Sequence, residues 1–190
     1  MKLLFLDVET TGLSPYKHGI WQLAGRIYIN KEKKEEFDLK CAPFEKDECN
    51  EQALHLNKIT EADVRDFPSP PEVYKGFVKM LDKYVDRYNK QDKFFFIGYN
   101  ARFDNDHLYQ WFKKNGNNYC AAYYHFPPID VMQAAMRTLM KQRPEMLNFK
   151  LATVARTLGI KVEEEKLHDA MYDIDITEQV YKKCGGIYAF

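Results

Sequence analysis

Apolar runs in the first hundred residues predict four β-strands. Residues 3–7 predict a short buried strand, an apolar run that ends at Asp7, and the apolar run at residues 94–98 predicts another. Residues 19–30 and 35–41 predict two further strands around a polar turn at 30–34. Three strands therefore open the chain, and a fourth follows near its middle.

Apolar positions at helical spacing predict helices between and after these strands. A short helix is expected over residues 51–57, and an amphipathic helix after the proline-rich break at 68–71, through the apolar positions of 77–88. The later helices are expected near 104–114 and over 131–141, 148–158 and 169–184, with a loop at Pro127 and Pro128. This order favours an α/β fold with a mixed central sheet flanked by α-helices.

Length and charge limit the organisation further. A chain of 190 residues can bury one core and shows no convincing linker, so we expect a single domain over residues 1–190. Lys plus Arg and Asp plus Glu total 28 each, so no overall positive field attracts nucleic acid, which excludes a histone-like or coat-like binder. The 13 Tyr and 13 Phe are expected mainly in the core, with base stacking as an alternative role.

The cysteines and the amino-terminal residues bear on location. Cys41, Cys49, Cys120 and Cys184 lack C-x-x-C spacing, and Asp7 interrupts the first apolar run before a signal-peptide core could form. We therefore expect reduced thiols and an intracellular, cytoplasmic protein. No stretch approaches the roughly 18 consecutive apolar residues of a membrane helix, so no membrane partner is expected.

An acidic pair closes the first predicted strand. Asp7 and Glu9 are two residues apart, so in extended chain their side chains leave the same face and can share a cation. A solvated strand end is the alternative. Thr10 and Thr11 follow with hydroxyls, and Gly12 gives a flexible backbone able to approach a nucleotide, although Gly12 could equally serve as a turn residue.

Two later carboxylates are expected to face inward. Asp104 shares a helical stripe with Leu108, whereas Asp106 points elsewhere, and helix capping is the alternative role of Asp104. Asp173 lies on the inward stripe of the last predicted helix, whereas Asp175 lies off it.

A histidine precedes the last predicted helix. His168 would lie about 140° from Asp173 around the axis if both were helical. We therefore place it in the loop ahead of the helix, with Asp169 as N-cap, from where it could reach a site. A solvated loop histidine is the alternative.

The acidic residues together predict a metal site. Two carboxylates about 4 Å apart repel by around 4 kcal/mol at an effective dielectric constant of 20, so several gather only with cations or raised pKa values. Oxygen ligands favour Mg²⁺ or Mn²⁺ over zinc. The expected ligands are Asp7, Glu9, Asp104 and Asp173.

Three segments, in order, resemble the motifs of the DEDDh 3′-to-5′ exonucleases, a family that includes polymerase proofreading subunits and RNA-trimming enzymes. They are residues 5–13, 100–104 and 168–173, so the resemblance spans nearly the whole chain. It implies a ribonuclease H-like fold, two divalent cations (Mg²⁺ or Mn²⁺) held by the four carboxylates, and His168 as general base. The substrate contacts that it suggests are Thr10, Thr11, Gly12, Leu13, Asn100 and Phe103.

Within these contacts the resemblance makes Leu13 an apolar wedge beside the terminal base. For Asn100 a turn-stabilising role is the alternative, and for Phe103 a place in the core. The chain also departs from the family: relatives often have Phe at His107, Glu at Gln22 and a His-Gly pair at 57–58. These departures leave the metal ligands and the base intact and concern how the terminal nucleotide is gripped.

A basic segment begins within the fourth predicted helix and continues past its end. Arg137, Lys141, Arg143 and Lys150, with only Glu145 opposing them, could guide a single strand toward the site. A solvated helical face is the alternative.

The predicted function is a metal-dependent 3′-to-5′ exonuclease that releases nucleoside 5′-monophosphates from single-stranded DNA, or RNA, by a two-metal mechanism with His168 taking the proton of water. The implied partners are single-stranded 3′ ends and a DNA polymerase. Two alternatives stay open: a non-catalytic nucleic-acid-binding or polymerase-accessory module with the same fold, and internal RNA cleavage.

Overall fold

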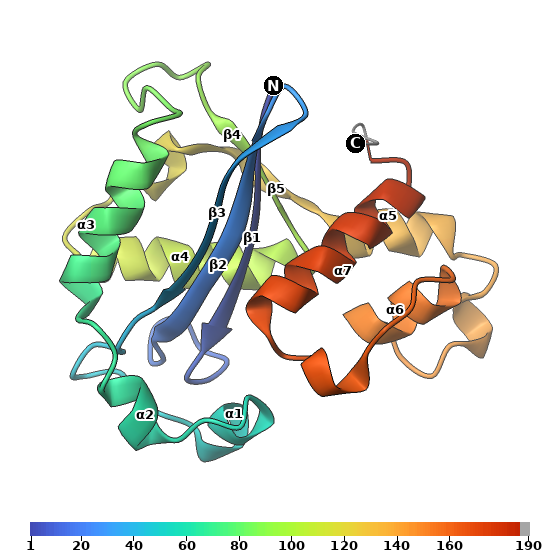
Figure 1. Ribbon diagram of the computed structural model, residues 1–190, viewed down its shortest axis with the longest axis horizontal. Coiled ribbons are helices and arrows are strands. Elements are labelled where there is room, and N and C mark those ends of the chain that lie inside the picture. The colour runs from blue at the N-terminus through green and yellow to red at the C-terminus, as the bar shows by residue number, and fades with distance from the viewer. Residues whose placement is uncertain (187–190) are drawn as a thin grey trace.

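A five-stranded mixed sheet forms the centre of the computed structural model, which describes residues 1–186 (Figure 1). The strands are β1 (Lys2–Thr10), β2 (Ile20–Ile29), β3 (Glu32–Lys40), β4 (Phe94–Gly98) and β5 (Tyr124–Asp130). Their order is β3-β2-β1-β4-β5; β1, β2 and β3 pair antiparallel, whereas β4 is parallel to both β1 and β5. The predicted mixed sheet flanked by helices is confirmed.

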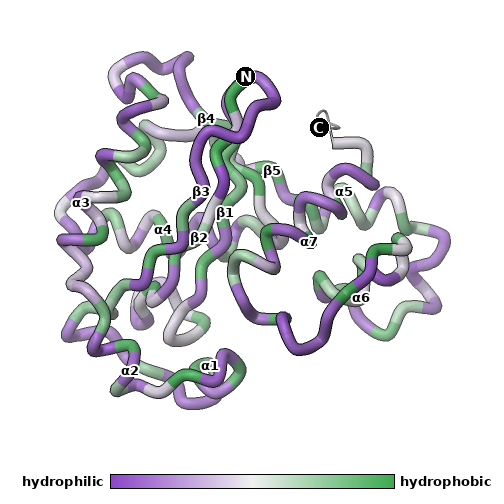
Figure 2. Tube along the Cα trace, viewed as in Figure 1, coloured by the Kyte–Doolittle hydropathy of each residue, from purple (hydrophilic) through white to green (hydrophobic). Residues whose placement is uncertain are grey.

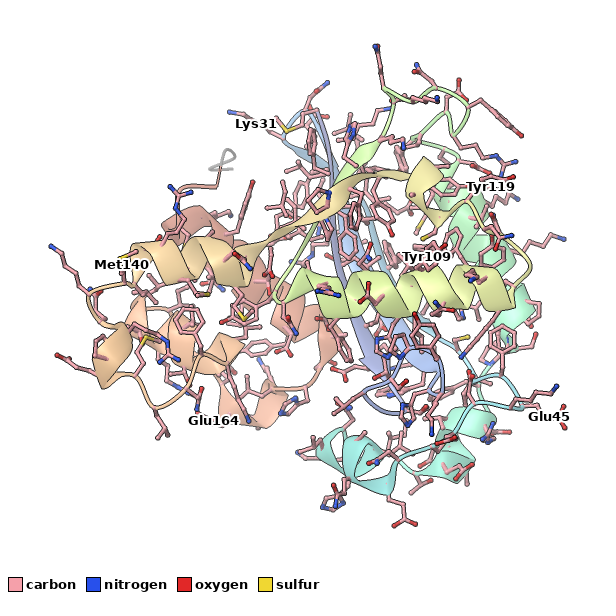
Figure 3. The ribbon with its side chains drawn as sticks, turned by 180° about the vertical axis from the view of Figure 1, so that it is seen from behind. Lys31, Glu45, Tyr109, Tyr119, Met140 and Glu164 are labelled. Atoms are coloured by element: carbon pink, nitrogen blue, oxygen red, sulfur yellow. The ribbon has the colours of Figure 1, made fainter. Side chains whose placement is uncertain are left out.

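Helices cover both faces of this sheet. The α-helices are α1 (Glu51–Leu56), α2 (Glu61–Arg65), α3 (Pro70–Leu81), α4 (Ala101–Lys114), α5 (Val131–Thr138), α6 (Leu151–Thr157) and α7 (Ala170–Lys183). Three 3₁₀ turns are η1 (Cys120–Ala122), η2 (Arg143–Glu145) and η3 (Glu164–Lys166). Seen from behind, α4 crosses one face of the sheet, with Tyr109 labelled on it (Figure 3). Among the described residues, no helix is long and apolar enough to cross a membrane.

Alternate side chains of β1 enter two different apolar cores. Leu4 and Leu6 pack on the face covered by α3 and α4, together with Phe77. Leu3 and Phe5 pack on the opposite face, which α5, α6 and α7 cover. Figure 2 shows the same division of the chain: the central strands are largely in the hydrophobic colours, whereas the β2–β3 turn is hydrophilic. The strand that carries Asp7 and Glu9 is therefore held on both sides.

The turn between β2 and β3 is shorter than predicted. Asn30 and Lys31 both have positive φ angles, 50° and 77°, and form a two-residue hairpin connection of the kind that matches strand twist. As a result, β3 begins at Glu32, earlier than the expected strand at 35–41.

The amphipathic helix predicted through residue 88 ends at Leu81. The side chain of Asp86 accepts the backbone N–H of Tyr88, and that of Asn89 accepts the N–H of Gln91. Such local side-chain bonds compete with helical ones. The apolar residues at 84, 85 and 88 therefore belong to the connection to β4, and their helical spacing was misleading.

Three other boundaries were wrong. Pro127 and Pro128, expected in a loop, lie in β5, an edge strand where a missing N–H is tolerated. Helix α2 was not predicted, although Thr60 and Asp63 form a capping box at its start. Helices α5 and α6 are both shorter than expected; Asn148 lies outside α6 and its side chain accepts the N–H of Lys150.

Candidate active site

Strand β1 directs two carboxylates toward helix α7. Asp7 and Glu9 extend the alternation of Leu3 and Phe5, which face the core beneath α7. Both acidic residues are partly buried. The predicted pair therefore shares one face at the carboxyl end of the central strand, and the start of α7 lies beside that end in Figure 1.

Helix α4 brings Asp104 to the same strand. Its side chain is only 3% exposed, and its Oδ1 accepts a hydrogen bond of 3.1 Å from the backbone N–H of Val8, between the two acidic residues of β1. Leu108 is buried one turn later, whereas Asp106 is half-exposed and pairs with Arg102. The predicted division between Asp104 and Asp106 is confirmed.

Helix α7 supplies the fourth carboxylate. Asp169 caps the helix by accepting the N–H of Tyr172 at 2.9 Å, and Asp173 follows one turn later. One oxygen of Asp173, Oδ1, is buried and has no hydrogen-bond partner, whereas Asp175 pairs with Arg26 on the outside. The inward position of Asp173 agrees with its predicted stripe.

Burial and neighbouring carboxylates raise the pKa of all four carboxyl groups. Burial raises the pKa of Asp7 well above its usual value, and the charges of Asp104, Glu9 and Asp173 raise it further. Burial likewise raises the pKa of Glu9 to about 7, of Asp104 to about 8 and of Asp173 to about 7. Ionisation of one carboxyl group therefore disfavours ionisation of its neighbours, and a bound cation would offset this repulsion.

The donor set fits a hard divalent cation. Within residues 1–186, no group of three or more His, Cys, Asp or Glu side chains lies in an arrangement that could hold a metal ion as it stands. Carboxylates without a compensating charge repel one another. The buried, unpartnered Oδ1 of Asp173 and a set made only of oxygen ligands nevertheless match what Mg²⁺ or Mn²⁺ requires.

His168 lies outside the helix, as expected. It sits between η3 and α7, is exposed, and has a φ of 69°, in the left-handed region. A cleft of about 200 Å³ adjoins it. Among the residues that line the cleft are Gln22, Lys40, Asn57, Lys58, His168 and Asp169. The histidine therefore borders the same cleft as the residues around Glu9.

The loop after β1 keeps its hydroxyl groups inside. Thr10 Oγ1 donates to the carbonyl of Gly12, and Thr11 Oγ1 donates to the carbonyl of Glu48 while accepting the N–H of Gly19. A Cβ at Gly12 would lie 2.5 Å from the ring of His18, so a close approach requires glycine there. This loop exposes the apolar side chain of Leu13, 83% of whose surface is accessible, and also the ring of Tyr16.

The other two predicted substrate contacts differ in exposure. Asn100 is the N-cap of α4 with a left-handed φ of 58°; its backbone N–H donates to Asp130, and its side chain is exposed and caps nothing. Phe103 is partly buried, packs against the core and lies 4.3 Å from the ring of His107. Asn100 therefore has a free side chain, whereas Phe103 is shared with the core.

The predicted basic segment is exposed. All four basic residues lie on the surface, Arg137 in α5 and the others between α5 and the start of α6, and Arg143 lies over the ring of Phe149. Their guanidinium and ammonium groups are accessible to a strand, and that role stays a prediction.

Sequence reasoning missed the partner of Glu9. Asn57 Nδ2 donates to Glu9 Oε2 at 2.9 Å, a contact between residues 48 positions apart. The departure from the His-Gly pair at 57–58 was the available signal. Lys58 has a left-handed φ of 55°, a backbone conformation that glycine adopts without steric cost.

Replacement Lys58→Gly should therefore stabilise the protein. A non-glycine residue in the left-handed region costs about 1 kcal/mol, so we expect the melting temperature to rise by about 2–4 °C in thermal unfolding. Lys46→Gly, at an exposed turn residue outside that region, is the control and should lower or leave the melting temperature. A decrease for Lys58→Gly would contradict this account of the turn.

A family model described as Exonuclease (RNase_T) matches residues 4–181. No curated protein matches the chain. Among solved structures, E. coli exonuclease I in complex with a dT13 oligonucleotide has a TM-score of 0.73 and 23% identity, over 95% of this chain and 40% of that one.

Other exonuclease I structures agree. The zinc-bound form of the E. coli protein in complex with single-stranded DNA has a TM-score of 0.73 and 22% identity, over 97% and 41% of the two chains. A structure of SSB and exonuclease I in complex with an inhibitor has a TM-score of 0.69 and 20% identity, over 95% and 41%. The chain thus spans about two fifths of these neighbours. The likeness concerns the fold, and the expected ribonuclease H-like architecture is confirmed.

Proposed function

Because this chain belongs to the exonuclease family whose model covers residues 4–181, we propose that it is a DEDDh-type 3′-to-5′ exonuclease acting on single-stranded DNA. One observation carries the proposal: three elements supply four carboxyl groups whose pKa is raised by burial and by neighbouring carboxylates, and Asn57, the hydrogen-bond partner of Glu9, lines the cleft that His168 borders. The oligonucleotide in the E. coli neighbour supports a single-stranded substrate. We treat residues 1–190 as one exonuclease domain.

Asp7, Glu9, Asp104 and Asp173 would hold two divalent cations. When bound, the cations activate a water molecule and neutralise charge on the scissile phosphate. Oxygen ligands favour Mg²⁺ or Mn²⁺, and the zinc-bound neighbour makes Zn²⁺ a useful comparison in any assay. Asp104 additionally holds its helix to β1 through the N–H of Val8, so it fixes the spacing of the two elements.

His168 acts as the general base. From its loop it takes a proton from the attacking water, and this requires a neutral imidazole nitrogen within hydrogen-bond reach of that water. Exposed Leu13 and the side chain of Asn100 contact the terminal nucleotide, whereas Thr10 and Thr11 shape the backbone that carries Leu13. A proofreading role with a polymerase partner is what the family resemblance suggests.

A single assay tests the function. We expect the protein with Mn²⁺ to shorten a 5′-labelled single-stranded oligonucleotide stepwise from its 3′ end and to release nucleoside 5′-monophosphates, while Asp7→Ala gives no product. Matched DNA and RNA substrates, single- and double-stranded, define the preference.

Three results would contradict the proposal. Scattered internal cuts would indicate an endonuclease. Tight strand binding without product would indicate a binding module. If the substrate stayed intact and the wild type and Asp7→Ala bound metal with equal affinity, the protein would not be a metal-dependent nuclease.

A further inference from the structure

The side chain of Asn57 is joined to one of the proposed cation ligands. Its Nδ2 donates to Oε2 of Glu9 at 2.9 Å. We propose that Asn57 is a positioning residue, which fixes the carboxylate of Glu9 and thereby links helix α1 to the four acidic residues. The inference rests on the proposed function, because it assumes that Glu9 binds a cation.

The fold holds Asn57 in place from two directions. It is the C-cap of α1, and its backbone N–H donates to the carbonyl of Leu54 at 3.1 Å. Leu54 is buried in a small cluster with Trp21 and Val64, which fastens α1 to the sheet. The left-handed turn at Lys58 then directs the chain away. The amide is therefore presented by a packed element, which limits its freedom.

The residue opposite Glu9 in the sheet is committed elsewhere. Gln22 pairs with Glu9 in the β1–β2 register, but its Nε2 donates to Asp38 at 2.8 Å. Lys40 attracts Glu9 electrostatically, while its ammonium lies 4.9 Å from the ring centroid of Trp21. Asn57 is accordingly the neighbour whose hydrogen bond sets the orientation of the Glu9 carboxylate.

The second polar atom of the amide supports this assignment. Asn57 Oδ1 is buried and has no hydrogen-bond partner. Both acceptors near the amide, Oε2 of Glu9 and the carbonyl of Ala53 at 3.5 Å, take their hydrogen bonds from the NH₂ group, so the amide oxygen is left unsatisfied. A buried unsatisfied acceptor is unfavourable for folding, which points to a benefit in function.

The test separates positioning from stability with three variants. Asn57→Ala removes the amide, and Asn57→Leu removes it while keeping a similar volume. Asn50→Ala removes the side-chain cap at the other end of α1, where Asn50 Oδ1 accepts the N–H of Ala53. Residues that orient a metal ligand typically change metal affinity by 10–100-fold when replaced.

We expect both Asn57 variants to weaken Mn²⁺ binding about tenfold in isothermal titration calorimetry, and Asn57→Leu to melt no lower than the wild type without metal. Asn50→Ala should melt lower yet bind Mn²⁺ with unchanged affinity. Wild-type affinity in Asn57→Ala and Asn57→Leu, or an equal loss in Asn50→Ala, would overturn the inference alone. A wild type that binds no Mn²⁺ would overturn the proposed function as well.

Discussion

Asp104→Asn should abolish nuclease activity and, at pH 8, raise the melting temperature of the metal-free protein. The activity loss should exceed the roughly 100-fold effect of residues that merely support a metal ligand. Asparagine retains an oxygen for the N–H of Val8, so the link between α4 and β1 survives the change. The two effects together would show that the Asp104 carboxylate lowers stability at this pH and is required for activity.

The stability gain follows from the raised pKa. Asp104 binds its proton more tightly in the folded protein, with a pKa of about 8, than in the unfolded chain, whose usual value is 3.8. Unfolding free energy therefore falls as the pH rises from about 4 to about 8. A neutral amide removes that loss, so we expect a gain of about 2 kcal/mol at pH 8, several degrees in melting temperature, and almost none at pH 4.

Thermal unfolding in chelator at the two pH values measures this effect, beside an oligonucleotide assay with Mn²⁺. Asp106→Asn is the matched control, since Asp106 lies on the same helix but is half-exposed and paired with Arg102. It should leave both activity and stability nearly unchanged. If Asp104→Asn melted below the wild type at pH 8, or retained full activity, Asp104 would not be a metal ligand whose burial destabilises the fold.

His168→Ala should lower turnover by about 10²–10⁴-fold, the usual contribution of a general base, while Mn²⁺ affinity stays within about twofold of the wild type. The reason is spatial: His168 lies in an exposed loop beside the cleft, whereas the carboxylates lie on packed elements. Single-turnover kinetics and calorimetric Mn²⁺ titration measure the two quantities separately.

The control for this prediction is His55→Ala, at an exposed histidine on α1. It should change neither turnover nor Mn²⁺ affinity. If His168→Ala lost metal affinity and turnover in equal proportion, His168 would have a structural role, and the proton acceptor would have to be sought elsewhere.

Local periodicity was enough to predict much of the candidate site. A helix of 3.6 residues per turn separates Asp104 from Asp106 and Asp173 from Asp175, whatever the rest of the fold. The loop position of His168 followed from the same geometry.

What the sequence could not predict depends on contacts distant along the chain or on competing local bonds. Asn57 reaches Glu9 across 48 positions, and no local pattern encodes that contact. The hydroxyls of Thr10 and Thr11 looked available until their carbonyl partners were placed. Likewise, helical spacing past Leu81 could not reveal that Asp86 and Asn89 bond to the backbone instead.

The division of β1 between two apolar cores has a mechanical consequence. Asp104 comes from α4 on one face of the sheet, Asp173 from α7 on the opposite face, and Asp7 and Glu9 from the strand between them. A cation bound by ligands from all three layers would cross-link both helical layers to the sheet. The stability of the fold and its catalytic activity would then depend on the same carboxylate oxygen atoms, so a chelator would lower the melting temperature and abolish activity together.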